Sequence, residues 1–377
     1  MALKVGIVGL NGIGNTHADA HSKDPMAELV ATCDSVKERA EKAAEKHGAR
    51  AYGSVDEMLR NEPDLDIVDV CTGGLENGSW HFEPAMEALD AGKNVLVEKP
   101  LSSDIHEARQ MVALADEQRV YLGCNLNHYF TPPADKAREY MDSGGVGELI
   151  YCLCKMGFQG GAPANYQAPR SPKVAGFPYF HLKAFLSHPL SVMRHFCGDV
   201  THVQAFLNRP GFRKAAGDAL ISTASVHLKF ANDAVGYLLS QRGDASYGLG
   251  GWWSVEVAGT SGTFCIENCI EKVSYWKAPD KRGPGLPAQY APDAPEAPVV
   301  TESGTIDFGQ TFPRRIHAFL EDVTNRVPLN DLRASGRDAL AALEYTFAIM
   351  DSYEQGGVLV RPHPLPPIVT DPVKLRG

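Results

Sequence analysis

The stretch VGIVGLNGIGNTHA, residues 5–18, nearly matches the glycine-rich turn that binds dinucleotides. The general pattern is G-x-G-x-x-G between a β-strand and an α-helix. Here Gly9 and Gly14 occupy the first and third glycine positions, Asn11 occupies the second, and Gly12 lies between them. Asn adopts unusual backbone angles more readily than most residues. The stretch therefore still predicts the strand, turn and helix that begin a Rossmann fold.

Strand-like and helix-like segments alternate over the first third of the chain. The strand-like segments are residues 3–9, 27–34, a short stretch near Tyr52, 65–72, 93–100 and 120–125, and the helix-like segments after the first are Val36–His47, Val55–Arg60, Phe82–Ala91 and Asp104–Gln118. Strands separated by helices predict a parallel sheet with right-handed crossovers. We therefore expect residues 1–126 to form a dinucleotide-binding Rossmann domain with a doubly wound parallel sheet.

The pattern changes after this point. Apolar and polar residues alternate in ISTASVHLKF, residues 221–230, and further strand-like segments follow after short turns. Consecutive strands without intervening helices predict an antiparallel sheet with one covered face. Helix-like segments flank it near Pro133–Ser143, Pro189–Phe196, Pro313–Asn325 and Gly336–Gln355, and residues 278–298, with six prolines, resemble an extended arm. We expect residues 127–377 to form an α+β domain with a large, mainly antiparallel sheet that binds substrate and mediates oligomerisation.

Composition excludes several classes of protein. A net charge of −10 on 377 residues disfavours a surface for nucleic acid or anionic membranes. No apolar run is long enough to span a membrane, and no signal peptide is evident. The eight cysteines include no C-x-x-C pair, so neither a zinc ribbon nor a redox motif is predicted. We expect a cytoplasmic protein with no nucleic-acid or membrane partner.

The context of the turn favours a cofactor over an empty βα turn, which is the alternative. Backbone N–H groups of Gly9, Asn11, Gly12 and Ile13 are positioned to hold a pyrophosphate. Asp34 ends the second strand, 20 residues after Gly14, and a carboxylate there accepts hydrogen bonds from the ribose and repels a 2′-phosphate. NAD is therefore the expected cofactor and NADP the less favoured one. The remaining expected cofactor contacts near these strand ends are Ser35, Thr72 and Gly73.

A second signal is VLVEKPLS, residues 95–102, in which a lysine and a proline end a predicted parallel strand. At this point the chain resembles the Gfo/Idh/MocA family of NAD(P)-dependent sugar dehydrogenases. The matching segments run in order along nearly the whole chain: VGIVGLNGIGNTHA, AELVATCD, DIVDVCT, HFEPAMEALDAGKNVLVEKPLS, NHYFTP, AREYMDSGGVGEL and DALAALEYTFAIMDSYEQGG. The tripeptide E-K-P is the most specific of them.

The resemblance implies roles for particular residues. Lys99 matches the lysine that contacts the reacting hydroxyl, and Glu98 matches a glutamate near the nicotinamide ribose. The resemblance also implies that a cis peptide bond precedes Pro100. Asn127 matches an asparagine near the cofactor in an N-x-R-F-x-P pattern. Tyr129 replaces the arginine of that pattern and is expected among the substrate-binding residues.

The family also has a helix with the pattern D-x-x-x-H-x-x-D, followed by W and G. In AFLSHPLSVMRHFCG, residues 184–198, His188 matches the histidine, which makes it the expected proton acceptor. The linked positions hold Ala184, Ser191, His195 and Gly198, so both aspartates are absent. His181 and Lys183 are candidate substitutes in the substrate pocket.

A metal site is not expected among the three histidines. His181, His188 and His195 recur every seven residues, and successive members of such a series on one helix lie roughly 10 Å apart, too far for one ion. Pro189 also disfavours one continuous helix from residue 181. We interpret His195 as a packed residue in the position of the family's tryptophan.

These features predict an oxidoreductase that transfers a hydride between a secondary alcohol of a sugar, sugar derivative or cyclic polyol and NAD(P). Residues 157–170 have the composition of a loop over a polar substrate, with Asn165, Tyr166 and Arg170 as candidate contacts. Two alternatives stay open, an NAD-dependent glycosidase that uses transient oxidation and a non-catalytic sugar sensor. Family members bury the open face of their sheet, so we expect a homo-oligomer, a dimer or a tetramer.

Overall fold

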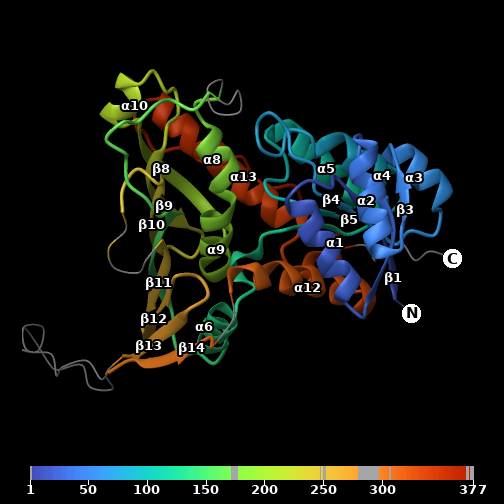
Figure 1. Cartoon of the computed structure of the whole chain (residues 1–377). Helices are drawn as coiled ribbons and strands as arrows, with labels where there is room; N and C mark the ends of the chain where they lie inside the picture. Colours follow the sequence, from blue (N-terminus) through green and yellow to red (C-terminus); the bar gives the residue numbers. More distant parts are fainter. Residues whose placement is uncertain are drawn as a thin grey trace, which may run out of the picture.

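The structure is a computed structural model that describes residues 2–170, 177–246, 248, 252–278, 297–304, 307–370 and 373. These residues form two β-sheets that stand side by side with helices packed around and between them (Figure 1). Of the expected arm at residues 278–298, residues 279–296 lie outside the described part of the chain. No helix in the described ranges has the length and apolar character needed to span a bilayer.

The first sheet is parallel and has six strands in the order β3-β2-β1-β4-β5-β6. Its strands are β1 (Leu3–Val8), β2 (Ala27–Cys33), β3 (Arg50–Tyr52), β4 (Ile67–Val70), β5 (Asn94–Val97) and β6 (Leu122–Cys124). The helices that connect them are α1 (Ile13–Lys23), α2 (Lys37–His47), α3 (Val55–Asn61), α4 (Phe82–Asp90) and α5 (Ile105–Gln118). This order is that of the doubly wound fold, and the strand order reverses between β1 and β4. The predicted Rossmann sheet is confirmed.

The second sheet has eight strands in the order β14-β13-β12-β11-β7-β10-β9-β8. Its strands are β7 (Leu149–Phe158), β8 (Val200–Asn208), β9 (Thr223–Phe230), β10 (Val235–Arg242), β11 (Trp253–Gly259), β12 (Gly262–Glu267), β13 (Lys272–Lys277) and β14 (Val299–Glu302). Neighbours pair antiparallel except β7 and β10, which pair parallel. The predicted large, mainly antiparallel sheet is therefore confirmed.

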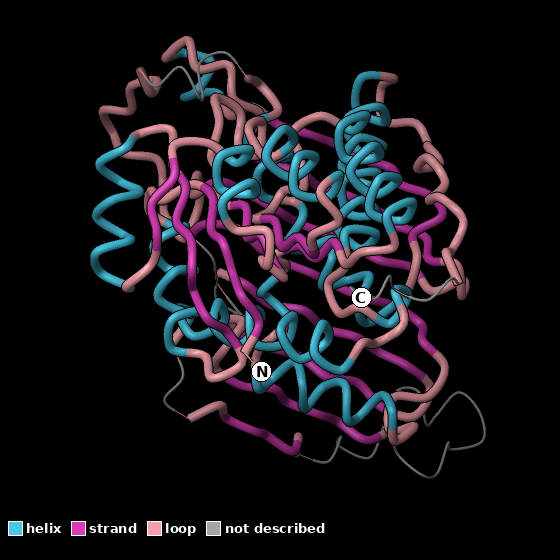
Figure 2. Tube along the Cα trace, turned by 90° about the vertical axis from the view of Figure 1, so that its right-hand side faces the viewer, coloured by secondary structure: helices cyan, strands magenta, loops and turns pink. Residues whose placement is uncertain are grey.

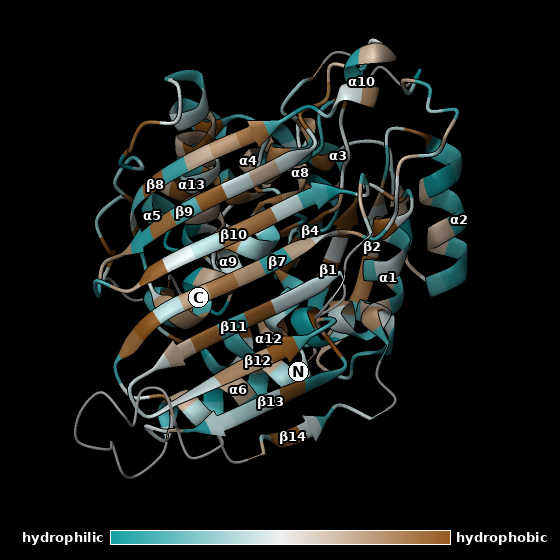
Figure 3. Ribbon diagram, turned by 90° about the vertical axis from the view of Figure 1, so that its left-hand side faces the viewer, coloured by the Kyte–Doolittle hydropathy of each residue, from teal (hydrophilic) through white to brown (hydrophobic). Residues whose placement is uncertain are grey.

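Within the described ranges, helices cover one face of the second sheet and leave the other open. They are α6 (Pro132–Asp142), α8 (Phe180–Phe185), α9 (Ser187–Cys197) and α13 (Gly336–Glu354), with a short α10 (Gly211–Ala215) at the sheet's end. The long strands lie behind these helices in Figure 2, while Figure 3 looks onto the opposite face, where no described helix lies over the strands. That open face carries exposed apolar side chains, including Leu153, Phe206 and Val235.

Three short 3-10 turns complete the described elements: η1 (Asn127–Tyr129), η2 (Phe308–Gln310) and η3 (Leu329–Asp331). One late helix, α12 (Thr311–Asn325), packs beside α1 against the first sheet. Its apolar residues Ile316 and Phe319 share a core with Val5 and Ile7 of β1. The chain thus returns to the first sheet after building the second. The division at residues 126/127 stays a prediction from sequence, since α12 joins the first sheet from beyond it.

Candidate active site

A cavity of about 870 Å³ lies along the carboxyl ends of the first sheet's strands and extends to the inner face of the second. This is the crevice in which open parallel sheets bind ligands. Residues from the turn after β1 line one end, and residues after β5 line the middle. The far wall is aromatic. Besides Lys99 and the residues around the glycine-rich turn, the cavity lining includes Glu98, Asn127, His128, Phe158, Gln159, Phe185, His188, Trp252, Phe308 and Phe312.

The glycine-rich turn has the geometry that its sequence predicts. Gly9 and Gly12 have positive φ angles of 89° and 54°, which favour glycine. A Cβ atom on Gly14 would lie 1.8 Å from the carbonyl oxygen of Gly9, so only glycine lets α1 approach β1 this closely. Asn11 is not among the residues with positive φ. The turn therefore does not require glycine at position 11, which explains how it accommodates asparagine.

Asp34 occupies the second strand's end as expected. Its side chain is only 7% exposed, and its two carboxylate oxygens accept hydrogen bonds from the backbone N–H groups of Leu10 and Val36, each at 2.8 Å. A carboxylate oxygen can accept more than one hydrogen bond, so both keep capacity for ribose hydroxyls. The Arg39 guanidinium lies 3.8 Å away. Ser35, Thr72 and Gly73 line the same end of the cavity.

Lys99 and Glu98 lie at the centre of the cavity, after β5. The Lys99–Pro100 peptide bond is cis, as the resemblance implied. Lys99 Nζ donates to the carbonyl oxygen of Ala184 at 3.3 Å. Burial lowers the pKa of Lys99, while the nearby Glu98 charge opposes that shift. The ammonium of this lysine therefore releases its proton more readily than that of an exposed lysine.

A network of buried, hydrogen-bonded side chains lies behind Glu98, and it was not predicted from the sequence. His17, on α1, places Nδ1 2.9 Å from Asp69 and Nε2 3.1 Å from Glu98. His21 contacts the same Asp69 oxygen at 2.8 Å, and Asn125 hydrogen-bonds to Glu98. Burial alone would lower the pKa of His17, but the charge of Asp69 and its hydrogen bond raise it well above its ordinary value. The raised pKa favours the charged form of His17 between the two carboxylates.

The pKa values of the two carboxyl groups that contact His17 are lowered. Burial would raise the pKa of Asp69 and of Glu98, but the charge and hydrogen bonds of His17 lower both. His17 belongs to the glycine-rich stretch of residues 5–18, so the histidine itself was visible in the sequence. Only the fold brings Asp69 and Glu98 against it. Cys71 also lies close enough to Asp69 and His17 for a shared metal ion, but burial raises the pKa of its thiol, which disfavours the thiolate.

His188 lies in the first turn of α9 and lines the cavity, as expected for a proton acceptor. Its imidazole stacks on that of His128 with ring centroids 3.6 Å apart and planes inclined by 13°. Burial, together with the charges of His128 and Lys99, lowers its pKa well below the ordinary value. Burial also lowers the pKa of His128 to about 3. His128 was not predicted, because nothing in NHYFTP distinguishes it from a packed histidine.

Tyr129 does not reach the cavity, which corrects the expectation that it contacts substrate. Its ring stacks on His195, with centroids 4.4 Å apart, and lines a separate cavity with Arg138 and Arg194. The packed position expected for His195 agrees with this contact. Asn127 does line the main cavity and donates to Thr311 Oγ1 at 2.7 Å.

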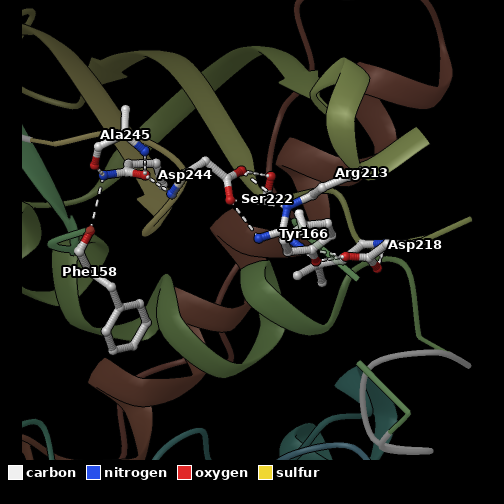
Figure 4. Close-up of polar contacts among 9 residues, drawn as sticks. Phe158, Tyr166, Arg213, Asp218, Ser222, Asp244 and Ala245 are labelled. Atoms are coloured by element: carbon white, nitrogen blue, oxygen red, sulfur yellow. Dashed lines mark hydrogen bonds and ion pairs between the residues drawn. The ribbon is translucent and has the colours of Figure 1, made fainter. Parts of the chain in front are cut away.

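The other expected substrate residues also lie outside the cavity lining. His181 is fully buried beside Ser240 Oγ at 3.1 Å, because α8 turns it into the second sheet. Lys183 points toward Glu76, with Nζ and Oε2 3.1 Å apart. Tyr166 belongs to a polar cluster with Arg213 and Asp218 (Figure 4). The remaining two, Asn165 and Arg170, are exposed and do not line the cavity.

Comparison with models of known protein families shows which family the chain belongs to. Residues 3–126 match the model described as "Oxidoreductase family, NAD-binding Rossmann fold", and residues 134–265 match the "GFO/IDH/MocA C-terminal domain". The chain belongs to the Gfo/Idh/MocA oxidoreductase family. This membership agrees with the two sheets and with the E-K-P lysine in the cavity.

Individual members of the Gfo/Idh/MocA family resemble the chain more distantly. It is 25% identical over 297 residues to levoglucosan dehydrogenase of Pseudarthrobacter phenanthrenivorans, covering 69% of this chain and 73% of that protein. It is 26% identical over 269 residues to scyllo-inositol 2-dehydrogenase (NAD(+)) of Bacillus subtilis, covering 70% and 73%. A solved structure of levoglucosan dehydrogenase in complex with NADH and levoglucosan aligns with a TM-score of 0.78 at 19% identity, over 98% of this chain and 100% of that one. At this sequence identity, the structural similarity to levoglucosan dehydrogenase shows a shared fold only.

Proposed function

We propose that this oxidoreductase oxidises a secondary alcohol of a sugar, sugar derivative or cyclic polyol with NAD as the hydride acceptor. The observation that carries the proposal is the meeting of Lys99 and His188 in the same cavity as the glycine-rich turn. The relatives named for levoglucosan and scyllo-inositol support a carbohydrate or polyol substrate. Aromatic walls such as Phe158 and Trp252 suit the apolar face of a ring alcohol.

The residues of the first sheet fit a dinucleotide. At Gly12, which immediately precedes α1, an added Cβ atom would meet no atom within 4 Å, so the start of the helix is open, which suits a pyrophosphate. Asn11, Gly12 and Ile13 would hold that group, Gly9, whose N–H donates to the carbonyl oxygen of Cys33 at 2.8 Å, would line the same turn, and Asp34 would accept the ribose hydroxyls. The other residues assigned to the cofactor are Ser35, Thr72, Gly73, Glu98 and Asn127. Bound NAD supplies the hydride acceptor. Asp34 favours NAD over NADP.

The proton is handled by the residues of this chain. Oxidation of the alcohol moves its carbon-bound hydrogen, with two electrons, to the nicotinamide and its hydroxyl hydrogen, as a proton, to a base. Lys99 would hydrogen-bond the reacting oxygen and stabilise its alkoxide character. Burial lowers the pKa of His188, which favours the neutral ring that a proton acceptor needs, and His188 would accept the proton directly or through Lys99.

The decisive experiment is the production of NADH, followed by absorbance, across a panel of sugars, glycosides and inositols. The Lys99→Met variant is the matched control, because it keeps a chain of similar length without the amine. Turnover by the parent and not by the control would support the proposal. Release of an aglycone from a glycoside would favour the glycosidase alternative, and ligand binding without turnover would favour the sensor.

A further inference from the structure

The chain departs from the family's patterns at Ala184 on α8, at Ser191 and His195 on α9, and at Tyr129 on η1. Three of these residues, Tyr129, Ser191 and His195, line the same smaller cavity. Two consecutive residues of η1 stack on two residues of α9 that are separated by two helical turns. His128 lies on His188 at 3.6 Å, and Tyr129 lies on His195 at 4.4 Å, with an interplanar angle of 13° in each pair.

Ala184 and Ser191 occupy the two positions that hold aspartates in the family's pattern. Neither side chain makes a hydrogen bond to the imidazole of His188. Ala184 has no polar side-chain atom, and Ser191 Oγ donates to the backbone carbonyl of His188 at 2.9 Å. Nδ1 of His188 is buried without a hydrogen-bond partner among the described residues, and so is Nδ1 of His128. The group that contacts the face of the His188 ring is therefore another ring.

We propose that His128 is a positioning residue, whose stacked imidazole orients the ring of His188 in place of a carboxylate, while the Tyr129–His195 stack anchors the same helix to η1. The catalytic consequence rests on the function proposed above for His188. The orientation itself does not, because it is a property of the protein without substrate or cofactor.

The physical consequence of the replacement is a difference in charge. A carboxylate beside an imidazole fixes its orientation and raises its basicity. A stacked imidazole fixes the ring plane through contact of the two faces and brings no negative charge. The titratable groups that face His188 are His128 from η1 and Lys99 from the end of β5, and Phe185 faces it from α8 without a charge. Two positively charged imidazolium rings this close would repel each other, and burial lowers the pKa of both histidines, so the stack favours two neutral rings.

The first test measures the ring of His188 directly, in cofactor-free protein. In histidine-selectively labelled protein, the Cε1–Hε1 signal of His188 is identified by its loss in His188→Ala. His128→Ala should move this signal downfield, because the shielding ring is removed, and His128→Phe should largely restore its position. The exposed residue His106 provides the matched control, and His106→Ala should leave the signal unchanged. An unchanged signal in His128→Ala would overturn the proposal.

The second test measures turnover with a substrate from the panel. His128→Ala should lower kcat by about 10- to 100-fold, the loss expected when a reacting group is misplaced, with KM and the Kd for NADH within about twofold of the parent. His128→Phe should recover most of the loss, and Ser191→Asp in the His128→Ala background should recover part of it by restoring a carboxylate. A loss in His128→Phe as large as in His128→Ala would overturn the proposal. If the ring signal behaves as expected but the parent turns over no substrate, the stack is supported and the proposed function fails.

Discussion

The ammonium group of Lys99 donates a hydrogen bond to the backbone carbonyl of Ala184, with the two atoms 3.3 Å apart. Lys99 follows β5 of the first sheet, whereas Ala184 lies in α8 beside the second sheet. This bond joins the two layers at the centre of the cavity. It also places the lysine next to the segment that leads to His188. A single substitution at position 99 therefore tests whether the two layers build one active site.

Lys99→Ala should abolish detectable turnover, a loss of at least about 10²-fold, because the lysine acts on the reacting oxygen. The Kd for NAD should change by less than about twofold, since the pyrophosphate is held by the turn after β1. The ratio of kcat/KM to that of the parent, with saturating NAD, checks the first claim, and fluorescence titration checks the second. Lys37→Ala, at an exposed lysine on α2, is the control. Retention of most activity would show that the role carried over from the family is wrong.

Asp34→Asn should weaken NAD binding by about 10- to 100-fold, the range expected for loss of charge-assisted hydrogen bonds. It should weaken NADP binding less, because removing the carboxylate also removes its repulsion of a 2′-phosphate and frees Arg39, 3.8 Å away. Fluorescence titration with both cofactors measures the change in preference. Arg39→Ala serves as the control and should leave NAD affinity nearly unchanged. Tighter binding of NADP by the parent would contradict the assignment of Asp34.

Asn11→Gly should leave NAD affinity unchanged or improve it, because the backbone at position 11 does not have a positive φ angle. Gly14→Ala is the contrasting variant. Its Cβ would lie 1.8 Å from the carbonyl oxygen of Gly9, so the turn must distort and NAD binding should be lost. Both affinities can be measured by calorimetry. A large loss in Asn11→Gly would reveal a specific role for the asparagine side chain.

His17→Gln should destabilise the fold by about 3 to 5 kcal/mol, the usual cost of removing one partner from a buried ion pair. The raised pKa of His17 contributes stability that is complete below about pH 6.5 and is lost as the pH rises through its folded value. The lowered pKa values of Asp69 and Glu98 contribute stability above about pH 4.5 that is lost on acidification.

The difference in Tm between the parent and His17→Gln should therefore be largest between about pH 4.5 and 6.5 and should shrink at higher pH. Circular dichroism of the cofactor-free proteins across this range measures it. His106→Ala, at an exposed histidine, should show no such pH-dependent difference. A constant difference from pH 5 to 9 would show that His17 is not protonated between the two carboxylates.

The open face of the second sheet should mediate a homo-oligomer. Leu153 and Phe206 on this face are 45% and 60% exposed, and exposed apolar patches of this kind mark interaction surfaces. Light scattering at micromolar concentration should give a mass above that of one chain. Leu153→Glu combined with Phe206→Glu should reduce it, whereas Ile368→Glu, at an exposed apolar residue in the C-terminal segment, should not. A parent that is a stable monomer would refute the expectation.

Local sequence patterns determined most of the secondary structure. The helix predicted for Asp104–Gln118 is observed at Ile105–Gln118, with the Asp104 carboxylate accepting the first backbone N–H bonds. The helix predicted near Pro189–Phe196 begins earlier, at Ser187, because Pro189 is accommodated within its first turn. Periodicity and capping act over a few residues, so they can be recognised without the rest of the fold.

The sequence by itself also determined the turn after β1, the position of Asp34 and the lysine of E-K-P, because each is a short motif at the end of a strand. Only the tertiary structure decided which distant side chains meet. It brought His17 between Asp69 and Glu98, stacked His128 on His188, and turned Tyr129, His181 and Lys183 away from the cavity. Such contacts depend on how crossovers and two sheets pack, and residue spacing along the chain does not encode them.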